Sequence, residues 1–133
     1  PNSGSQMNQA VFLALPYCGF LDFVPERGDA VWLDFDPQAG HEQRGRRPAV
    51  VLSPRSYNSK VGLALVCPIT SQEKGYPFEV TIPASVAVRG VVLADQIKSL
   101  DWQVRNAELI SALPPETVAE ILTKIGLLIS PAV

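Results

Sequence analysis

The sequence predicts a small, mainly β domain of the α+β class, in which five to seven short antiparallel strands precede one C-terminal helix. Its 133 residues are enough for one domain. Twelve prolines and nine glycines divide the chain into short pieces, which favours strands over long helices. A helical spacing of apolar residues is found only near the C-terminus.

The first strands are predicted from alternation and from apolar runs. Apolar and polar residues alternate from Asp29 to Asp36, as in a strand with one buried face. Residues 48–54 form a β-branched apolar run between two prolines, and residues 63–70 form a second apolar run. Both runs indicate buried strands. Residues 38–47 show no periodicity and are predicted to form a loop, and residues 56–62 are predicted to form a turn.

The second half of the chain continues this pattern. After a predicted loop at residues 71–77, residues 78–83 alternate and residues 91–93 are apolar, so each stretch indicates a strand. Residues 107–113 are predicted to be one more short strand or a turn.

The C-terminal helix is predicted from apolar residues that recur every three or four positions. They are Val118, Ile121, Leu122, Ile125, Leu128 and Ile129. Pro114 and Pro115 suit a first helical turn, and Glu116 is placed well near the positive end of the helix dipole. The apolar stripe is expected to cover the sheet.

The N-terminal region is predicted to lie outside the domain. Residues 1–6 are interpreted as an expression scar, residues 7–23 as an extension and residues 24–133 as the single domain. The apolar part of the extension is too short and too interrupted to span a bilayer. No basic residue precedes it, which disfavours a cleaved signal peptide.

Composition and missing motifs exclude several function classes. The formal net charge is −2, so a nucleic-acid partner would need a local basic patch. Cys18 and Cys67 have no metal or redox spacing, which favours a reducing cytosol. His41 is the only histidine, which excludes catalysis by two histidines and His-rich zinc sites. No G-x-S-x-G motif and no phosphate-binding glycine loop is present.

The two carboxylates Asp34 and Asp36 share one strand face. They permit a divalent cation site in principle. A solvated strand face is the favoured interpretation, because no third acidic ligand follows at a recognised spacing.

A local basic patch follows the first predicted strand. It contains Arg44, Arg46, Arg47, Arg55 and Lys60, against one acidic residue, Glu42. Arg47 directly precedes Pro48, which favours an extended backbone at a strand rim. A guanidinium fixed in this way suits an anion such as phosphate. Thr70 ends the next apolar run, so the two side chains would face one pocket if those strands were parallel neighbours or met across a barrel.

Three stretches resemble the MazF/PemK family of toxin endoribonucleases. They read GDAVWLDFDPQAGHEQRGRRPAVVLSP, PITSQEKGYPFEV and GVVLADQIKSLDW, and the resemblance runs from Pro25 to Ile129. It implies an SH3-like antiparallel β-barrel with a C-terminal helix, a homodimer, and a cytoplasmic toxin. It also implies metal-independent, cofactor-free cleavage of single-stranded RNA to 2′,3′-cyclic phosphate and 5′-hydroxyl ends. The expected partner is an acidic, MazE-like antitoxin.

The resemblance also implies site residues. The catalytic positions match Arg47, Thr70 and Glu42. Positions that resemble substrate contacts are Trp32, Asp34, Phe35, Gln43, Arg46, Lys74 and Gln96.

Each role is expected from the chemistry of the side chain. Arg47 would chiefly stabilise the phosphorane, because an arginine side chain is essentially always protonated and is therefore a poor general base. Thr70 would hold a non-bridging oxygen. Glu42 is the candidate general base and His41 the alternative. Trp32 would stack on RNA bases or anchor a dimer interface.

Two other functions are known for folds of this kind, and the sequence disfavours both. A CcdB-like gyrase-binding toxin would be expected to carry a tryptophan near its C-terminus, and none follows Trp102. An SH3-like adaptor for proline-rich peptides would need more exposed aromatic residues than a content of 8 % provides.

Overall fold

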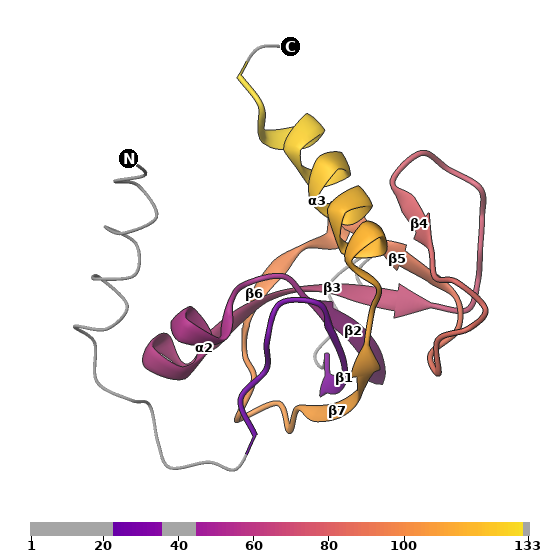
Figure 1. Cartoon of the computed structure of the whole chain (residues 1–133). Helices are drawn as coiled ribbons and strands as arrows, with labels where there is room; N and C mark the ends of the chain where they lie inside the picture. The colour runs from indigo at the N-terminus through magenta and orange to yellow at the C-terminus, as the bar shows by residue number, and fades with distance from the viewer. Residues whose placement is uncertain (1–22, 36–44, 132–133) are drawn as a thin grey trace.

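The fold is described from a computed structural model that covers residues 23–35 and 45–131. The elements along these residues are β1 (Asp29–Asp34), β2 (Arg46–Val51), α2 (Arg55–Val61), β3 (Leu63–Thr70), β4 (Glu79–Thr81), β5 (Val91–Leu93), the 3₁₀ helix η1 (Ala94–Gln96), β6 (Lys98–Asp101), β7 (Glu108–Ala112) and α3 (Pro115–Ile129). The mainly β, α+β class predicted from the sequence is confirmed (Figure 1).

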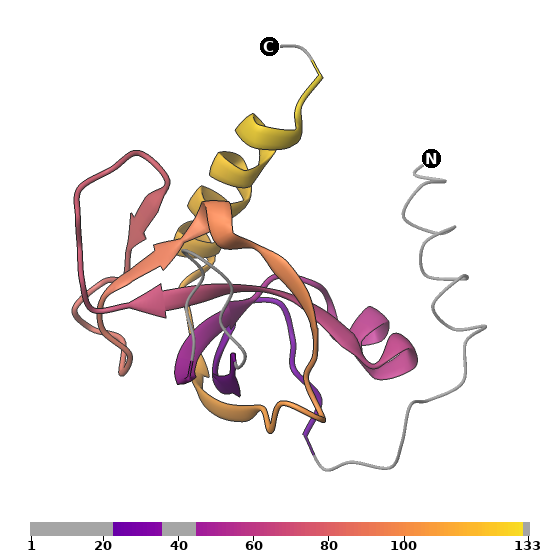
Figure 2. The ribbon, with the colours of Figure 1, turned by 180° about the vertical axis from the view of Figure 1, so that it is seen from behind.

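The seven strands form one curved antiparallel sheet. Its strand order is β4-β5-β3-β2-β1-β7, with β6 paired to β3 beside this path. The path has two ends, so the sheet is barrel-like in curvature but is not a closed barrel (Figures 1 and 2). β3 is the hub of the sheet, because it pairs with β6 along its first half, with β2 in its middle and with β5 at its end.

Side chains on both faces of the sheet are buried, in two clusters. One cluster lies beneath α3 and includes Val50, Ile69 and Ile121. The other contains Leu33 and Trp102. Because successive side chains of a strand point to opposite faces, β1 and β2 contribute to both clusters.

The buried thiol of Cys67 belongs to the cluster beneath α3. Burial raises its pKa to about 12, so the group is a neutral thiol at physiological pH. Cys67 is the free cysteine of the described residues, and Cys18 lies outside them. No helix in the described part of the chain is long and apolar enough to cross a membrane.

The prediction of a turn at residues 56–62 is wrong, because helix α2 occupies Arg55–Val61. Tertiary contacts stabilise this short helix. The amide of the buried Asn58 donates to the carbonyl oxygens of Pro25 and Ser53, and the indole N–H of Trp102 donates to the carbonyl of Asn58. The contacts with Pro25 and Trp102 involve residues distant in sequence, so the local pattern gives no sign of them.

One strand, β2, begins earlier than predicted, and another, β6, was not predicted. β2 begins at Arg46, two residues before the predicted start at Pro48. β6 (Lys98–Asp101) was not predicted as a separate strand, and its pairing with β3 stabilises it. Residues 63–70 form β3 as predicted, and the C-terminal helix is α3. The predictions for residues 1–22 lie outside the described residues.

Helix α3 covers the sheet with one face, and its C-terminal end extends past the sheet edge in both views (Figures 1 and 2). Ile121 is fully buried, whereas its neighbour Leu122 is 41 % exposed. Ile121→Ala is expected to lower the free energy of unfolding by about 2–5 kcal/mol, through lost burial and the cavity left behind. Leu122→Ala is the matched control and should cost less than about 1 kcal/mol. Denaturant unfolding of both variants tests this, and equal losses would contradict the packing.

Candidate active site

Arg47 and Thr70 come together because β2 and β3 are antiparallel neighbours. The register pairs Ala49 with Pro68, and continuing it by two residues sets Arg47 opposite Thr70. One of the two arrangements predicted from the sequence required β2 and β3 to be parallel, and they are antiparallel. The start of β2 and the end of β3 lie at the same end of the sheet, where the side chains of Arg47 and Thr70 line one cavity of about 360 Å³.

The cavity is formed by the ends of strands β2 and β3, the loop of residues 71–78, and the segment from β4 to η1. Its lining residues are Arg47, Thr70, Ser71, Gln72, Lys74, Tyr76, Glu79, Leu93 and Gln96. Four of the residues predicted from the sequence are thus in one place: Arg47, Thr70, Lys74 and Gln96. A guanidinium, an ammonium, hydroxyls and amides around one cleft suit an anionic ligand.

Thr70 is held at the cleft by its own backbone pairing and by a local turn. It is only 8 % exposed, and its Oγ1 accepts a hydrogen bond from the backbone N–H of Gln72 at 3.2 Å. The hydroxyl hydrogen remains able to donate to a ligand oxygen. On the other side, Thr70 pairs with Val91 of β5.

Gly90 makes the close approach of β5 to Thr70 possible. Its φ is +121°, a backbone conformation that residues other than glycine rarely adopt. A Cβ at this position would lie 2.2 Å from the carbonyl oxygen of Thr70. Any side chain at Gly90 would therefore push against the backbone of Thr70.

The loop of residues 71–78 brings polar side chains to the cleft. Its Tyr76 hydroxyl donates to the carboxylate of Asp95, at 3.2 Å. Burial and then the charge of Asp95 raise the pKa of Tyr76, so the phenol is protonated at neutral pH. The backbone amides of Lys74 and Gly75 donate to the carboxylate of Glu79.

Gln96 offers an acceptor at the cleft. Its Oε1 is buried and has no hydrogen-bond partner among the described residues. A buried polar atom without a partner costs free energy. A ligand that donates a hydrogen bond to Oε1 would recover that cost.

Arg46 and Asp34 lie outside the cleft, although both were predicted as substrate contacts. The side chain of Arg46 lies on the opposite face of β2 from that of Arg47. Its guanidinium donates to Asp34 at 3.0 Å, to the carbonyl of Asn106 at 2.9 Å and to the carboxylate of Glu108. The amide of Asn106 and then Arg46 lower the pKa of Asp34. Asp34 is thus engaged with two donors.

The structure does not assemble metal ligands in the part of the chain that it describes. No group of three His, Cys, Asp or Glu side chains there is placed to hold a metal ion. Asp36, the second carboxylate considered for a cation, lies outside the described residues.

The two predicted stacking residues differ in exposure. Trp32 is 42 % exposed, so its ring offers a surface to a base or to another protein. Phe35 is 3 % exposed and packs in the cluster around Trp102. A base would reach the Phe35 ring only if this packing opened. His41, Glu42 and Gln43 lie outside the described residues.

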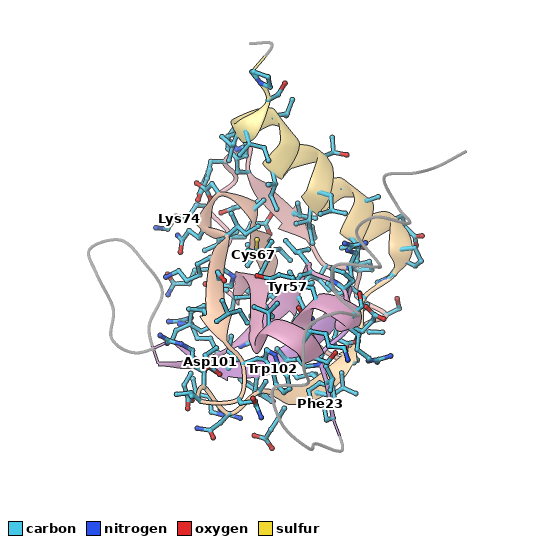
Figure 3. The ribbon with its side chains drawn as sticks, turned by 90° about the vertical axis from the view of Figure 1, so that its left-hand side faces the viewer. Phe23, Tyr57, Cys67, Lys74, Asp101 and Trp102 are labelled. Carbon is cyan, nitrogen blue, oxygen red and sulfur yellow. The ribbon has the colours of Figure 1, made fainter. Side chains whose placement is uncertain are left out.

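Five lining residues were not among the predicted site residues: Ser71, Gln72, Tyr76, Glu79 and Leu93. The first three were within reach of sequence analysis, because they follow Thr70 in the same loop. Glu79 and Leu93 gave no such signal, since each is an ordinary member of a strand. A second, more open cavity is lined by Phe23 and Trp102 among others. In Figure 3 these two residues lie in the lower half of the molecule, and Lys74 lies in its upper half.

A curved antiparallel sheet with one covering helix and a cationic cleft at its edge defines a small β protein suited to an anionic ligand. Comparison with known protein families identifies the family within this class. Residues 26–129 match the family described as PemK-like, MazF-like toxin of type II toxin-antitoxin system. The chain belongs to this family.

Individual relatives match nearly their full length. The chain is 50 % identical over 107 residues to the endoribonuclease toxin MazF of Escherichia coli K12, covering 80 % of this chain and 96 % of the relative. It is 40 % identical over 105 residues to the endoribonuclease toxin ChpB of the same strain, covering 75 % and 90 %.

Solved structures of Deinococcus radiodurans proteins show the same fold. Its MazF crystal structure has a TM-score of 0.78 and 58 % identity, covering 80 % of this chain and 97 % of that one. A MazE–MazF structure from this organism has a TM-score of 0.72 and 51 % identity, covering 80 % and 96 %.

Proposed function

We propose that this protein is an endoribonuclease that cleaves single-stranded RNA, and that it acts as the toxin of a toxin-antitoxin pair. The observation that carries the proposal is the meeting of Arg47 and Thr70 in one cleft. Two relatives at 50 % and 40 % identity bear the name endoribonuclease, which supports the same activity.

The proposed reaction uses the substrate's own 2′-hydroxyl as the nucleophile. Its oxygen attacks the adjacent phosphorus while a base takes its proton. The bond from phosphorus to the 5′-oxygen breaks, and that oxygen receives a proton. The products are a 2′,3′-cyclic phosphate and a 5′-hydroxyl, and no metal is required.

In this reaction Arg47 and Thr70 act on the phosphate. The guanidinium of Arg47 stabilises the extra negative charge of the phosphorane and protonates or stabilises the leaving 5′-oxygen. The hydroxyl of Thr70 donates to a non-bridging oxygen. The strands β2 and β3 place both residues at the cleft before the substrate arrives, which reduces the reorganisation needed in the transition state.

The general base is assigned to Glu42, with His41 as the alternative, and both lie outside the described residues. Two groups of the described cleft are poorly suited to the role. Tyr76 has a raised pKa and is protonated at neutral pH. The carboxylate of Glu79 already accepts two backbone hydrogen bonds.

RNA recognition is proposed for residues in the cleft and beside it. Lys74 pairs with a phosphate, and the buried Oε1 of Gln96 accepts a hydrogen bond from a base or a ribose. The exposed ring of Trp32 stacks on a base or contacts a second protomer. The remaining proposed contacts are Asp34, Phe35, Gln43 and Arg46.

The proposed partners follow from the family. Related solved structures carry the name MazE–MazF, which supports a cognate, acidic, MazE-like antitoxin for this chain. An acidic segment would complement the same cationic cleft that receives RNA and would thereby suppress cleavage. We also propose a homodimer and a cytoplasmic location. Full nuclease activity in a stoichiometric complex with the antitoxin would contradict this part of the proposal.

The test is cleavage of a long single-stranded RNA by the native protein in excess EDTA, followed by analysis of the fragment ends. Discrete fragments with cyclic phosphates and 5′-hydroxyls are expected. A folded native protein that cleaves no RNA, but inhibits DNA gyrase, would instead support the CcdB-like alternative. Cleavage that stops in EDTA would contradict the metal-independent mechanism.

A further inference from the structure

Glu79 is a buried carboxylate in the cleft to which the proposed reaction gives no chemical role. It is 9 % exposed and lines the same cavity as Arg47 and Thr70. A carboxylate is costly to bury unless hydrogen bonds replace its hydration. A negative charge in a cleft for phosphate also opposes the ligand. Its presence there therefore calls for a structural reason.

The reason lies in two backbone contacts within the preceding loop. Oε2 of Glu79 accepts the N–H of Lys74 at 3.0 Å, and Oε1 accepts the N–H of Gly75 at 2.8 Å. Each carboxylate oxygen thus holds one of two consecutive peptide groups. Gly75 has a φ of +82° with open space around its Cβ position, so glycine serves the turn rather than a close contact. Consecutive amides that converge on one anion form a backbone nest.

Glu79 is itself fixed to the body of the molecule by its backbone. It pairs with Leu93 across β4 and β5. Its carbonyl oxygen accepts a hydrogen bond from Nζ of Lys124, at 2.9 Å, which connects it to helix α3. Its N–H donates to the carbonyl of Tyr76 at 3.2 Å and closes the turn. The side chain of Glu79 therefore connects the loop to strand β4, and its backbone carbonyl connects that strand to the covering helix through Lys124.

We propose that Glu79 is a positioning residue that holds the loop so that Lys74 meets the RNA phosphate beside Arg47 and Thr70. This inference rests on the proposed function. Lys74 is exposed and lies at the edge of the molecule in Figure 3. Its backbone N–H is the group that the carboxylate of Glu79 holds. Without that carboxylate the loop samples other conformations, and Lys74 is no longer held where the substrate binds.

The experiment compares Glu79→Gln with Glu73→Gln, which removes an exposed carboxylate from the same loop. Glutamine keeps the shape of the side chain, but its NH₂ group cannot accept the second amide. Hydrogen exchange of the free protein should show faster exchange at Lys74 and Gly75 in Glu79→Gln and unchanged exchange in Glu73→Gln. KM for a short cleavable RNA should rise about three- to tenfold in Glu79→Gln, with kcat changed less than twofold.

A double-mutant cycle with Lys74→Gln separates positioning from a general loss of structure. If Glu79 acts through Lys74, adding Glu79→Gln to Lys74→Gln should cause no further rise in KM. Multiplicative effects of the two substitutions would overturn the proposal. If Glu79→Gln does not fold, Glu79→Asp keeps the charge but shortens the reach, and it should give the same coupled loss.

The two proposals fail in different ways. A native protein that cleaves no RNA would refute the proposed function, and binding of a non-cleavable RNA then replaces KM in the same cycle. Unchanged exchange at Lys74 and Gly75 in Glu79→Gln would refute the role of Glu79, even if RNA is cleaved normally.

Discussion

Replacing Arg47 with alanine is expected to lower kcat for RNA cleavage about 10²–10³-fold, while the protein remains folded. The side chain lines the same cavity as Thr70, at the ends of β2 and β3, where the phosphorane would form. Single-turnover cleavage of a short RNA measures the loss separately from product release.

The adjacent Arg46 provides the control for this substitution. It is also an arginine on β2, but it points to the opposite face and pairs with Asp34 and Glu108. Arg46→Ala removes the same charge from the protein without emptying the cleft. Its effect should fall on KM at most, within about tenfold. An equal loss of kcat in both variants would indicate a general charge effect and would contradict the role assigned to Arg47.

Gly90→Ala is expected to lower kcat by about 10²-fold through a shift of Thr70. A Cβ at Gly90 would lie 2.2 Å from the carbonyl oxygen of Thr70, so the two backbones must separate by about 1 Å to restore a normal contact. A misplacement of this size at a reacting group costs about 10²-fold. The variant should also lose about 1–3 kcal/mol of stability, because its φ of +121° is unfavourable for alanine.

Gly62→Ala separates the shift of Thr70 from the backbone strain. Gly62 has a φ of +83° at the C-terminal cap of α2, at the other end of β3 from Thr70. This control should lose stability but keep its kcat per folded molecule. Measuring kcat well below both melting temperatures makes the comparison fair. Equal kcat values in Gly90→Ala and Gly62→Ala would show that contact with Thr70 does not govern catalysis.

The sequence predicts the parts of the candidate site that lie at strand ends. Arg47 stands before a proline at the start of a buried strand, and Thr70 stands at the end of the next one, so both were identifiable as rim residues. Their meeting in one cleft was not predictable with certainty, because it depends on the register of β2 against β3. A shift of that register by one residue would turn one side chain to the other face.

The parts that sequence analysis missed depend on contacts between distant residues. Helix α2 depends on Asn58, which contacts Pro25 and Trp102. The alternating pattern around Glu79 correctly predicted a strand, but it gave no sign that the carboxylate holds the preceding loop. Phe35 was correctly placed on the apolar face of its strand, yet resemblance also suggested it as a substrate contact.

The residues of the cleft are far apart in the sequence, so the cleft forms late during translation. Arg47, Thr70, Glu79 and Gln96 come from separate elements, and Lys124, which anchors Glu79, lies in the final helix. At about 5–20 residues per second, several seconds of translation separate the first of these residues from the last. A nascent chain therefore holds no assembled cleft before α3 is made, and a ribosome that synthesises this protein is not exposed to the proposed nuclease activity until that helix has been added.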